Sequence, residues 1–166
     1  MQTVARTIVQ AIMMLSLAVT DALAQDPSSQ AFLRDAIEGN FAEIRMGELA
    51  QKNGQSGGIK TFGEALQNEH RDANSKALEA ARSLGIDPPT GPGAMANAAS
   101  EQLAKLTGPE FDRAFARHII ADHRKAIEKY EQASKRQDAA GSYATATLQV
   151  LRKHLQTAED LAKDAR

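Results

Sequence analysis

Four histidines, at positions 70, 118, 123 and 154, are the side chains in this sequence with the clearest capacity for chemistry. Imidazole nitrogens bind transition metals and exchange protons near neutral pH. Around His123, the stretch FDRAFARHIIADHRKAIEKY (residues 111–130) repeats apolar residues at steps of three and four, the spacing that lines one face of an α-helix. His123 lies on that apolar face, so it is the first candidate functional residue.

The other histidines fall into two groups. His70 and His154 lie, like His123, within apolar stripes of separate helical stretches, whereas His118 borders the solvent side of its stretch, one turn before Asp122. We therefore interpret His118 as a surface ion-pair partner and the other three as candidates for one buried site.

The three candidate histidines are expected at nearly the same height in an antiparallel bundle. Each helical residue advances the chain by about 1.5 Å, so height can be counted in residues from the expected helix ends. Offsets of 13 to 15 residues separate His70 from Gly85, Pro109 from His123, His123 from Asp138, and Gly141 from His154. Glu43, 10 residues before a break at Asn53, is expected near the same level.

Three imidazoles and a carboxylate at one height predict a site for a divalent transition metal, with zinc, copper or iron as candidates. The predicted ligands are His70, His123, His154 and Glu43. Glu69 and Asp122, each next to one of these histidines in the sequence, are predicted to orient the imidazoles as hydrogen-bond acceptors. The alternative is a buried hydrogen-bond network without metal, because each histidine alone is compatible with an ordinary core residue.

Other chemistry has little support in the sequence. Dinuclear iron bundles use Glu-x-x-His pairs, but the residues three positions before the candidate histidines are Gln67, Ile120 and Leu151. The sequence has no His-Glu-x-x-His, no Gly-rich phosphate loop and no Gly-x-Ser-x-Gly elbow. We therefore predict no catalytic residue and no organic cofactor, and the sequence leans away from an enzyme without deciding the question.

Four long helical stretches are expected to position the candidate site. They run over about residues 30–52, 59–84 and 109–136, and beyond a turn at 138–141, with a short extra helix at about 96–106 before the third. Ser28 or Ser29 is the expected cap of the first stretch, and Gly85 is expected to end the second. No alternating strand pattern is present, so the fold class is all-α, an antiparallel four-helix bundle.

The first 24 residues are predicted to be a cleavable signal peptide. Arg6 is followed by a mainly apolar run from Ile8 to Val19, and Ala22-Leu23-Ala24 has the small residues that signal peptidase recognises. No cysteine follows for lipid attachment, and the apolar run is shorter than the roughly 20 residues of a membrane span. We therefore expect residues 25–166 to form the bundle domain in the periplasm, with no integral membrane segment after cleavage.

The charge balance bears on partners. With 20 basic and 21 acidic residues interspersed, the chain lacks the basic excess typical of proteins that bind nucleic acid. There is no cysteine, so helix packing, with or without a metal, must hold the fold in an oxidising compartment. An envelope protein partner and self-association both stay open.

Several motifs resemble the bacterial exported family named domain of unknown function 4142, described as a predicted outer membrane protein. The motifs are Phe32-Leu33-Arg34-Asp35-Ala36, Gly39-Asn40-Phe41-Ala42-Glu43-Ile44, Glu69-His70, Gly108-Pro109-Glu110-Phe111-Asp112-Arg113-Ala114-Phe115, Ala121-Asp122-His123-Arg124-Lys125-Ala126 and Leu151-Arg152-Lys153-His154-Leu155. The resemblance implies a ferritin-like four-helix bundle with motif positions at Glu43, His70, Asp122, His123 and His154. The chain departs from the family pattern at Glu69, where an aspartate is usual, and at Gln149-Val150, where a proline is common.

Two main functional hypotheses follow, and a third, weaker one is a metal-dependent oxidase or hydrolase, which would require an open coordination position and a pocket. The first is an exported periplasmic bundle that binds a metal through its core histidines and serves storage, sensing or envelope stress. The second is a non-enzymatic structural or interaction module of the envelope, in which the histidines form a core hydrogen-bond network. The first predicts that metal raises the unfolding temperature, whereas the second predicts no metal effect and an exposed apolar patch.

Overall fold

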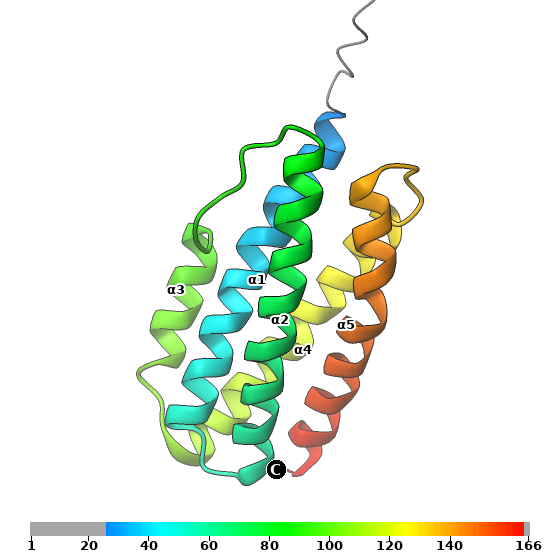
Figure 1. Cartoon of the computed structure of the whole chain (residues 1–166). Coiled ribbons are helices and arrows are strands. Elements are labelled where there is room, and N and C mark those ends of the chain that lie inside the picture. Colours follow the sequence, from blue (N-terminus) through cyan, green and yellow to red (C-terminus); the bar gives the residue numbers. More distant parts are fainter. Residues whose placement is uncertain (1–25, 165–166) are drawn as a thin grey trace, which may run out of the picture.

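The computed structural model describes residues 26–164, in which five α-helices and no strand are found (Figure 1). The helices are α1 (Pro27–Asn53), α2 (Gly57–Ser83), α3 (Ala94–Leu103), α4 (Gly108–Ala133) and α5 (Ala139–Asp164). The predicted helical stretches are confirmed, with ends that differ by at most about three residues, the usual error of such boundaries. The predicted signal peptide, residues 1–24, lies outside the described residues.

Local capping chemistry explains most of the boundary differences. Asp26, rather than Ser28 or Ser29, caps α1: its carboxylate accepts the Ser28 backbone N–H at 2.9 Å, and Pro27 takes the first helical position. Gly85 follows the end of α2 with a φ of 65°, as expected for a glycine stop. The expected turn at 138–141 is shorter than predicted, because the Asp138 side chain accepts the Gly141 N–H and starts α5 at Ala139.

The four long helices form an antiparallel bundle, as predicted. In Figure 1, α1 and α2 form one hairpin, α4 and α5 form the other, and the short α3 lies outside the bundle against α1. Within residues 26–164, none of the helices combines the length and apolar character required to cross a bilayer.

A polar layer divides the core into two apolar clusters. One cluster contains Ile37, Tyr130 and Leu151, and the other contains Met46, Leu66, Phe115, Ile119 and Ala158. Between these clusters along the four helices lie Asn40, Glu43, His70, His123 and His154, all buried. The bundle therefore encloses its candidate site on both sides with hydrophobic side chains.

The two helices of the first hairpin approach each other closely at Gly47 and Gly63. A Cβ atom added to Gly47 would collide with the Gly63 carbonyl, and one added to Gly63 would lie 2.6 Å from the Ala50 Cβ. Glycine at both positions therefore permits this packing. Contact between α1 and α4 is much less extensive, and a pocket lies on that side of the bundle.

Candidate metal centre

Three helices bring one histidine each to the same place in the core. His70 from α2, His123 from α4 and His154 from α5 are exposed by only 4%, 1% and 1%. One ring nitrogen from each lies within 4.8 Å of the other two. The sequence-based prediction that these three imidazoles converge is confirmed.

Each imidazole faces a hydrogen-bond acceptor on the side away from the cluster. His70 Nδ1 lies 2.9 Å from Asn40 Oδ1, His123 Nδ1 lies 3.2 Å from the Ile119 carbonyl, and His154 Nε2 lies 3.0 Å from Glu69 Oε2. A neutral imidazole carries one proton and one lone pair. Because all three outer partners accept, these contacts place each proton on the outer nitrogen.

The inner nitrogens therefore carry the lone pairs. Among residues 26–164, His70 Nε2 is buried without a hydrogen-bond partner, and His123 Nε2 lies 3.3 Å from His154 Nδ1. Tetrahedral zinc with bonds of about 2.0–2.1 Å holds two nitrogens roughly 3.3–3.4 Å apart. The spacing of His123 and His154 already fits two such ligands, and His70 offers a third ring nitrogen within 4.8 Å of them.

Burial keeps the cluster uncharged. Burial, and secondarily the neighbouring His154 ring, lower the pKa of His70 well below the usual range and that of His123 to about 3. Burial also lowers the pKa of His154, although the Glu69 carboxylate opposes this. Neutral imidazole is the form that binds metal, so the site is preset for coordination near neutral pH.

The predicted fourth ligand, Glu43, lies beside the cluster. Its Oε1 is 3.9 Å from His123 Nδ1, which is the outer nitrogen of that ring, and its Oε2 is buried without a hydrogen-bond partner in the described part of the chain. Burial, and secondarily the charge of Asp122, raise the pKa of Glu43 to about 8. Glu43 is therefore mainly a neutral acid at pH 7, and its role as a metal ligand stays a prediction.

The two predicted orienting carboxylates occupy different environments. Glu69 accepts from His154 on α5 rather than from its sequence neighbour His70, and it also accepts from Lys153 at 2.9 Å. Asp122 is half-exposed and lies 3.9 Å from His118, the surface ion pair that the sequence indicated. Glu69 thus occupies the predicted kind of position, whereas the described contact of Asp122 with a histidine is to His118.

Asn40 is the site residue that the sequence analysis missed. Its side chain links His70 to a buried tyrosine pair, because Asn40 Nδ2 donates to the Tyr143 hydroxyl at 3.0 Å and that hydroxyl lies 3.1 Å from the Tyr130 hydroxyl. A signal was available: Asn40 follows Ile37 by three residues and Leu33 by seven, on the apolar face of α1. An amide at such a position requires a buried partner.

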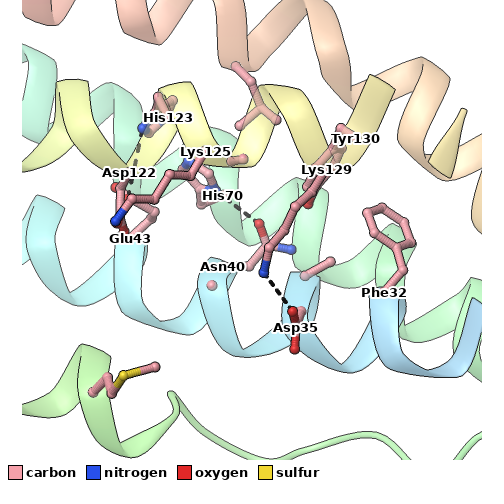
Figure 2. A pocket seen from close by; sticks show the side chains of 15 residues that line it. Phe32, Asp35, Asn40, Glu43, His70, Asp122, His123, Lys125, Lys129 and Tyr130 are labelled. Carbon is pink, nitrogen blue, oxygen red and sulfur yellow. Dashed lines mark hydrogen bonds and ion pairs between the residues drawn. The ribbon is translucent and has the colours of Figure 1, made fainter. Parts of the chain in front are cut away.

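A pocket between α1 and α4 reaches the histidine cluster from outside the bundle. It has a volume of about 320 Å³, and Figure 2 shows His70, His123, Glu43 and Asn40 among the side chains that line it. His154 and Glu69 do not line it. The pocket thus approaches the three nitrogens from the α1 side, the side that contributes no histidine.

Comparisons with known proteins agree with this architecture. Residues 15–161 match the model of a family described as "Domain of unknown function (DUF4142)". Among solved structures, the chain is similar to the crystal structure of a DUF305 fragment from Deinococcus radiodurans, with a TM-score of 0.75 and 14% identity over 84% of this chain and 98% of that one. No curated protein matches the sequence. At this identity the structural likeness shows the helical fold alone.

Proposed function

The chain belongs to the family described as domain of unknown function (DUF4142), and we propose that it is an exported protein that binds a divalent transition metal through His70, His123 and His154. The observation that carries this proposal is the inward direction of three imidazole lone pairs. The three outer acceptors place a proton on the outer nitrogen of each ring, so the cluster offers three nitrogen lone pairs to one cation. The fourth ligand is Glu43 or a small molecule.

The chemical types of the ligands limit which metal ions suit the site. Three imidazoles without a thiolate or thioether suit zinc, copper and iron, and divalent copper binds nitrogen sites most tightly among the first-row divalent ions. The acceptors at Asn40, Ile119 and Glu69 hold the rings in place, as hydrogen-bonded outer partners do at protein metal sites. Periplasmic storage or sensing of such a metal, or a part in envelope stress, is the role that we propose.

Metal content and thermal unfolding test the proposal directly. The chain from Gln25 onward is purified without a His-tag, its metal content is measured, and it is unfolded with chelator or with zinc, copper or ferrous iron. Free metal at 100 times Kd stabilises the folded state by about 2.7 kcal/mol, which corresponds to roughly 8–10 °C for a domain of this size. We expect one equivalent of metal and a shift of this order.

Matched variants test whether the buried histidines cause the metal-dependent shift in unfolding temperature. His123→Ala and His70→Gln are expected to abolish the metal-dependent shift, whereas His118→Ala, which removes a surface imidazole from the same helix, keeps it. Circular dichroism checks that each variant is folded. No bound metal and no stabilisation of the wild type would refute the proposal and favour the alternative, a core hydrogen-bond network in a structural or interaction module.

A further inference from the structure

The pocket between α1 and α4 has the dimensions and the lining of a small-molecule site. Its volume of about 320 Å³ lies at the lower end of the roughly 300–1,000 Å³ typical of such sites. Phe32 and Ala36 from α1 and Ala126 and Tyr130 from α4 give it an apolar wall, seen in part in Figure 2. Such a wall suits a hydrocarbon chain rather than water alone.

The inner part of the pocket holds polar atoms that lack partners. Glu43 is 6% exposed and His70 is 4% exposed, and Glu43 Oε2 and His70 Nε2 have no hydrogen-bond partner within residues 26–164. Buried polar groups are nearly always satisfied in folded proteins. The proposed metal would satisfy His70 Nε2, so Glu43 Oε2 is the atom that points to a ligand with a polar group at the inner end of the pocket.

The pocket also offers a positive charge without an ion-pair partner among residues 26–164, and Figure 2 shows the end of the Lys125 side chain beside Glu43. Lys129 is paired with Asp35 at 2.7 Å, and Asp122 lies 3.9 Å from His118. Lys125 lines the pocket and makes no ion pair among the residues that the structure describes. Its ammonium group is therefore available to an anion that enters between α1 and α4.

We propose that this pocket binds a small monocarboxylate with a short hydrocarbon chain, whose carboxylate completes the coordination of the metal held by the three histidines. The inference rests on the proposed function. The carboxylate lies toward His70 and His123, where Glu43 and the Lys125 ammonium supply hydrogen bonds, and the hydrocarbon chain lies against Phe32 and Ala126. A three-histidine site leaves a coordination position open for such a ligand.

A larger side chain at Gly39 should fill the pocket without disturbing the fold. It lines the pocket, and a Cβ atom added there meets no atom within 4 Å. Gly39→Leu also replaces a poor helix former with a good one, so the bundle is expected to stay folded. Gly57→Leu is the matched control, because a Cβ at Gly57 also meets nothing within 4 Å and Gly57 does not line this pocket.

The test uses protein loaded with Co²⁺, whose visible absorption reports its coordination, and titrates it with butanoate or with butan-1-amine. We expect butanoate to change the absorption of the wild type and of Gly57→Leu with affinities within twofold of each other. We expect the affinity to fall at least tenfold in Gly39→Leu and about threefold to tenfold in Lys125→Gln, and the amine to have no saturable effect.

The outcomes separate the two proposals. If Co²⁺ does not bind to the wild type, the proposed function fails and this inference fails with it. If Co²⁺ binds but butanoate leaves the absorption unchanged, the metal site stands and the carboxylate site is overturned. It is also overturned if Gly39→Leu responds like the wild type, because the anion would then reach the metal by another route, or if the amine binds as well as butanoate.

Discussion

His123 Nε2 lies 3.3 Å from His154 Nδ1, although the outer hydrogen bonds of both rings leave a lone pair on each of these two atoms. Two lone pairs at this distance repel, and either a cation between them or transfer of the His123 proton from Nδ1 to Nε2, which gives up the contact with the Ile119 carbonyl, removes the repulsion. An added proton would also relieve the repulsion, but burial lowers the pKa of both imidazoles and disfavours the protonated form. A metal ion satisfies the same geometry and also the third nitrogen, on His70.

Replacing Glu69 with glutamine tests the outer contact of His154. The carboxylate accepts the His154 Nε2 proton at 3.0 Å and so makes the inner nitrogen more electron-rich. In Glu69→Gln we expect metal affinity to fall by roughly 10–100-fold, the usual effect of losing such a partner, with little change in helix content. Competition with a chelator of known affinity measures the change.

The control for this variant is Glu159→Gln, which removes the same charge from α5 at a surface ion pair with Arg124. Equal losses of affinity in the two variants would mean that Glu69 acts only through its long-range charge.

Helix boundaries and the height of the site could be predicted because they depend on local signals. Gly85 and Pro109 mark helix ends through backbone conformation alone, and counting residues from such ends placed the histidines at one level. Ring orientation could not be predicted in this way. It depends on the Ile119 carbonyl, which every residue type possesses, and on Glu69, whose contact with His154 joins two helices.

The pocket was also beyond the reach of the sequence pattern. It lies between α1 and α4, which contact each other less extensively than α1 and α2 do. Periodicity identifies the buried face of a helix without giving its distance from each neighbour. The apolar face of α4 was predicted correctly at Phe111, Phe115 and Ile119, all fully buried.

Glu43→Gln is expected to stabilise the metal-free protein near neutral pH. The pKa of Glu43 is raised by burial to about 8, so between its unfolded value of about 4.5 and 8 the folded state holds a proton that the unfolded state releases. Stability from this group is therefore present at low pH and lost as pH rises through this window. At pH 7 we expect the variant to be more stable by about 3 kcal/mol.

The pH dependence distinguishes this effect from simple repacking. Urea unfolding at pH 4.5 and pH 7 should show the advantage of Glu43→Gln shrinking toward zero at the lower pH. A constant advantage at both values would show that the carboxyl group of Glu43 does not titrate in this environment.

Removing the Asn40 side chain is expected to loosen His70. Asn40→Ala deletes the acceptor of His70 Nδ1 and removes the Asn40 Nδ2 donor from the Tyr143 hydroxyl, both in the buried core. Loss of such partners costs about 1–3 kcal/mol of folding free energy. Metal affinity should also fall, because the proton of His70 is no longer held on the outer nitrogen. Urea unfolding and chelator competition measure the two effects.

Tyr143→Phe is the matched variant, since it removes the hydroxyl beyond Asn40 but keeps the acceptor of His70. It should destabilise the fold while leaving metal affinity within about threefold of the wild type. A loss of affinity as large as that of Asn40→Ala would assign the effect to general weakening of the core.

Metal binding should persist in mild acid, provided the protein stays folded. Histidines at an exposed site gain protons below about pH 6.5 and then release their metal. Here burial lowers the pKa of His123 to about 3 and that of His70 well below its usual range, so protons do not compete in the folded state until much lower pH.

The unfolded state does take up protons below about pH 6.5, so the metal-free fold weakens as pH falls, by about 2 kcal/mol between pH 7 and pH 5 from His123 alone. We therefore expect calorimetric metal affinity at pH 5.5 within threefold of that at pH 7.5, alongside a lower unfolding temperature without metal. A tenfold loss of affinity for each pH unit in this range, with the helices intact, would show that the imidazoles are protonated in the folded protein.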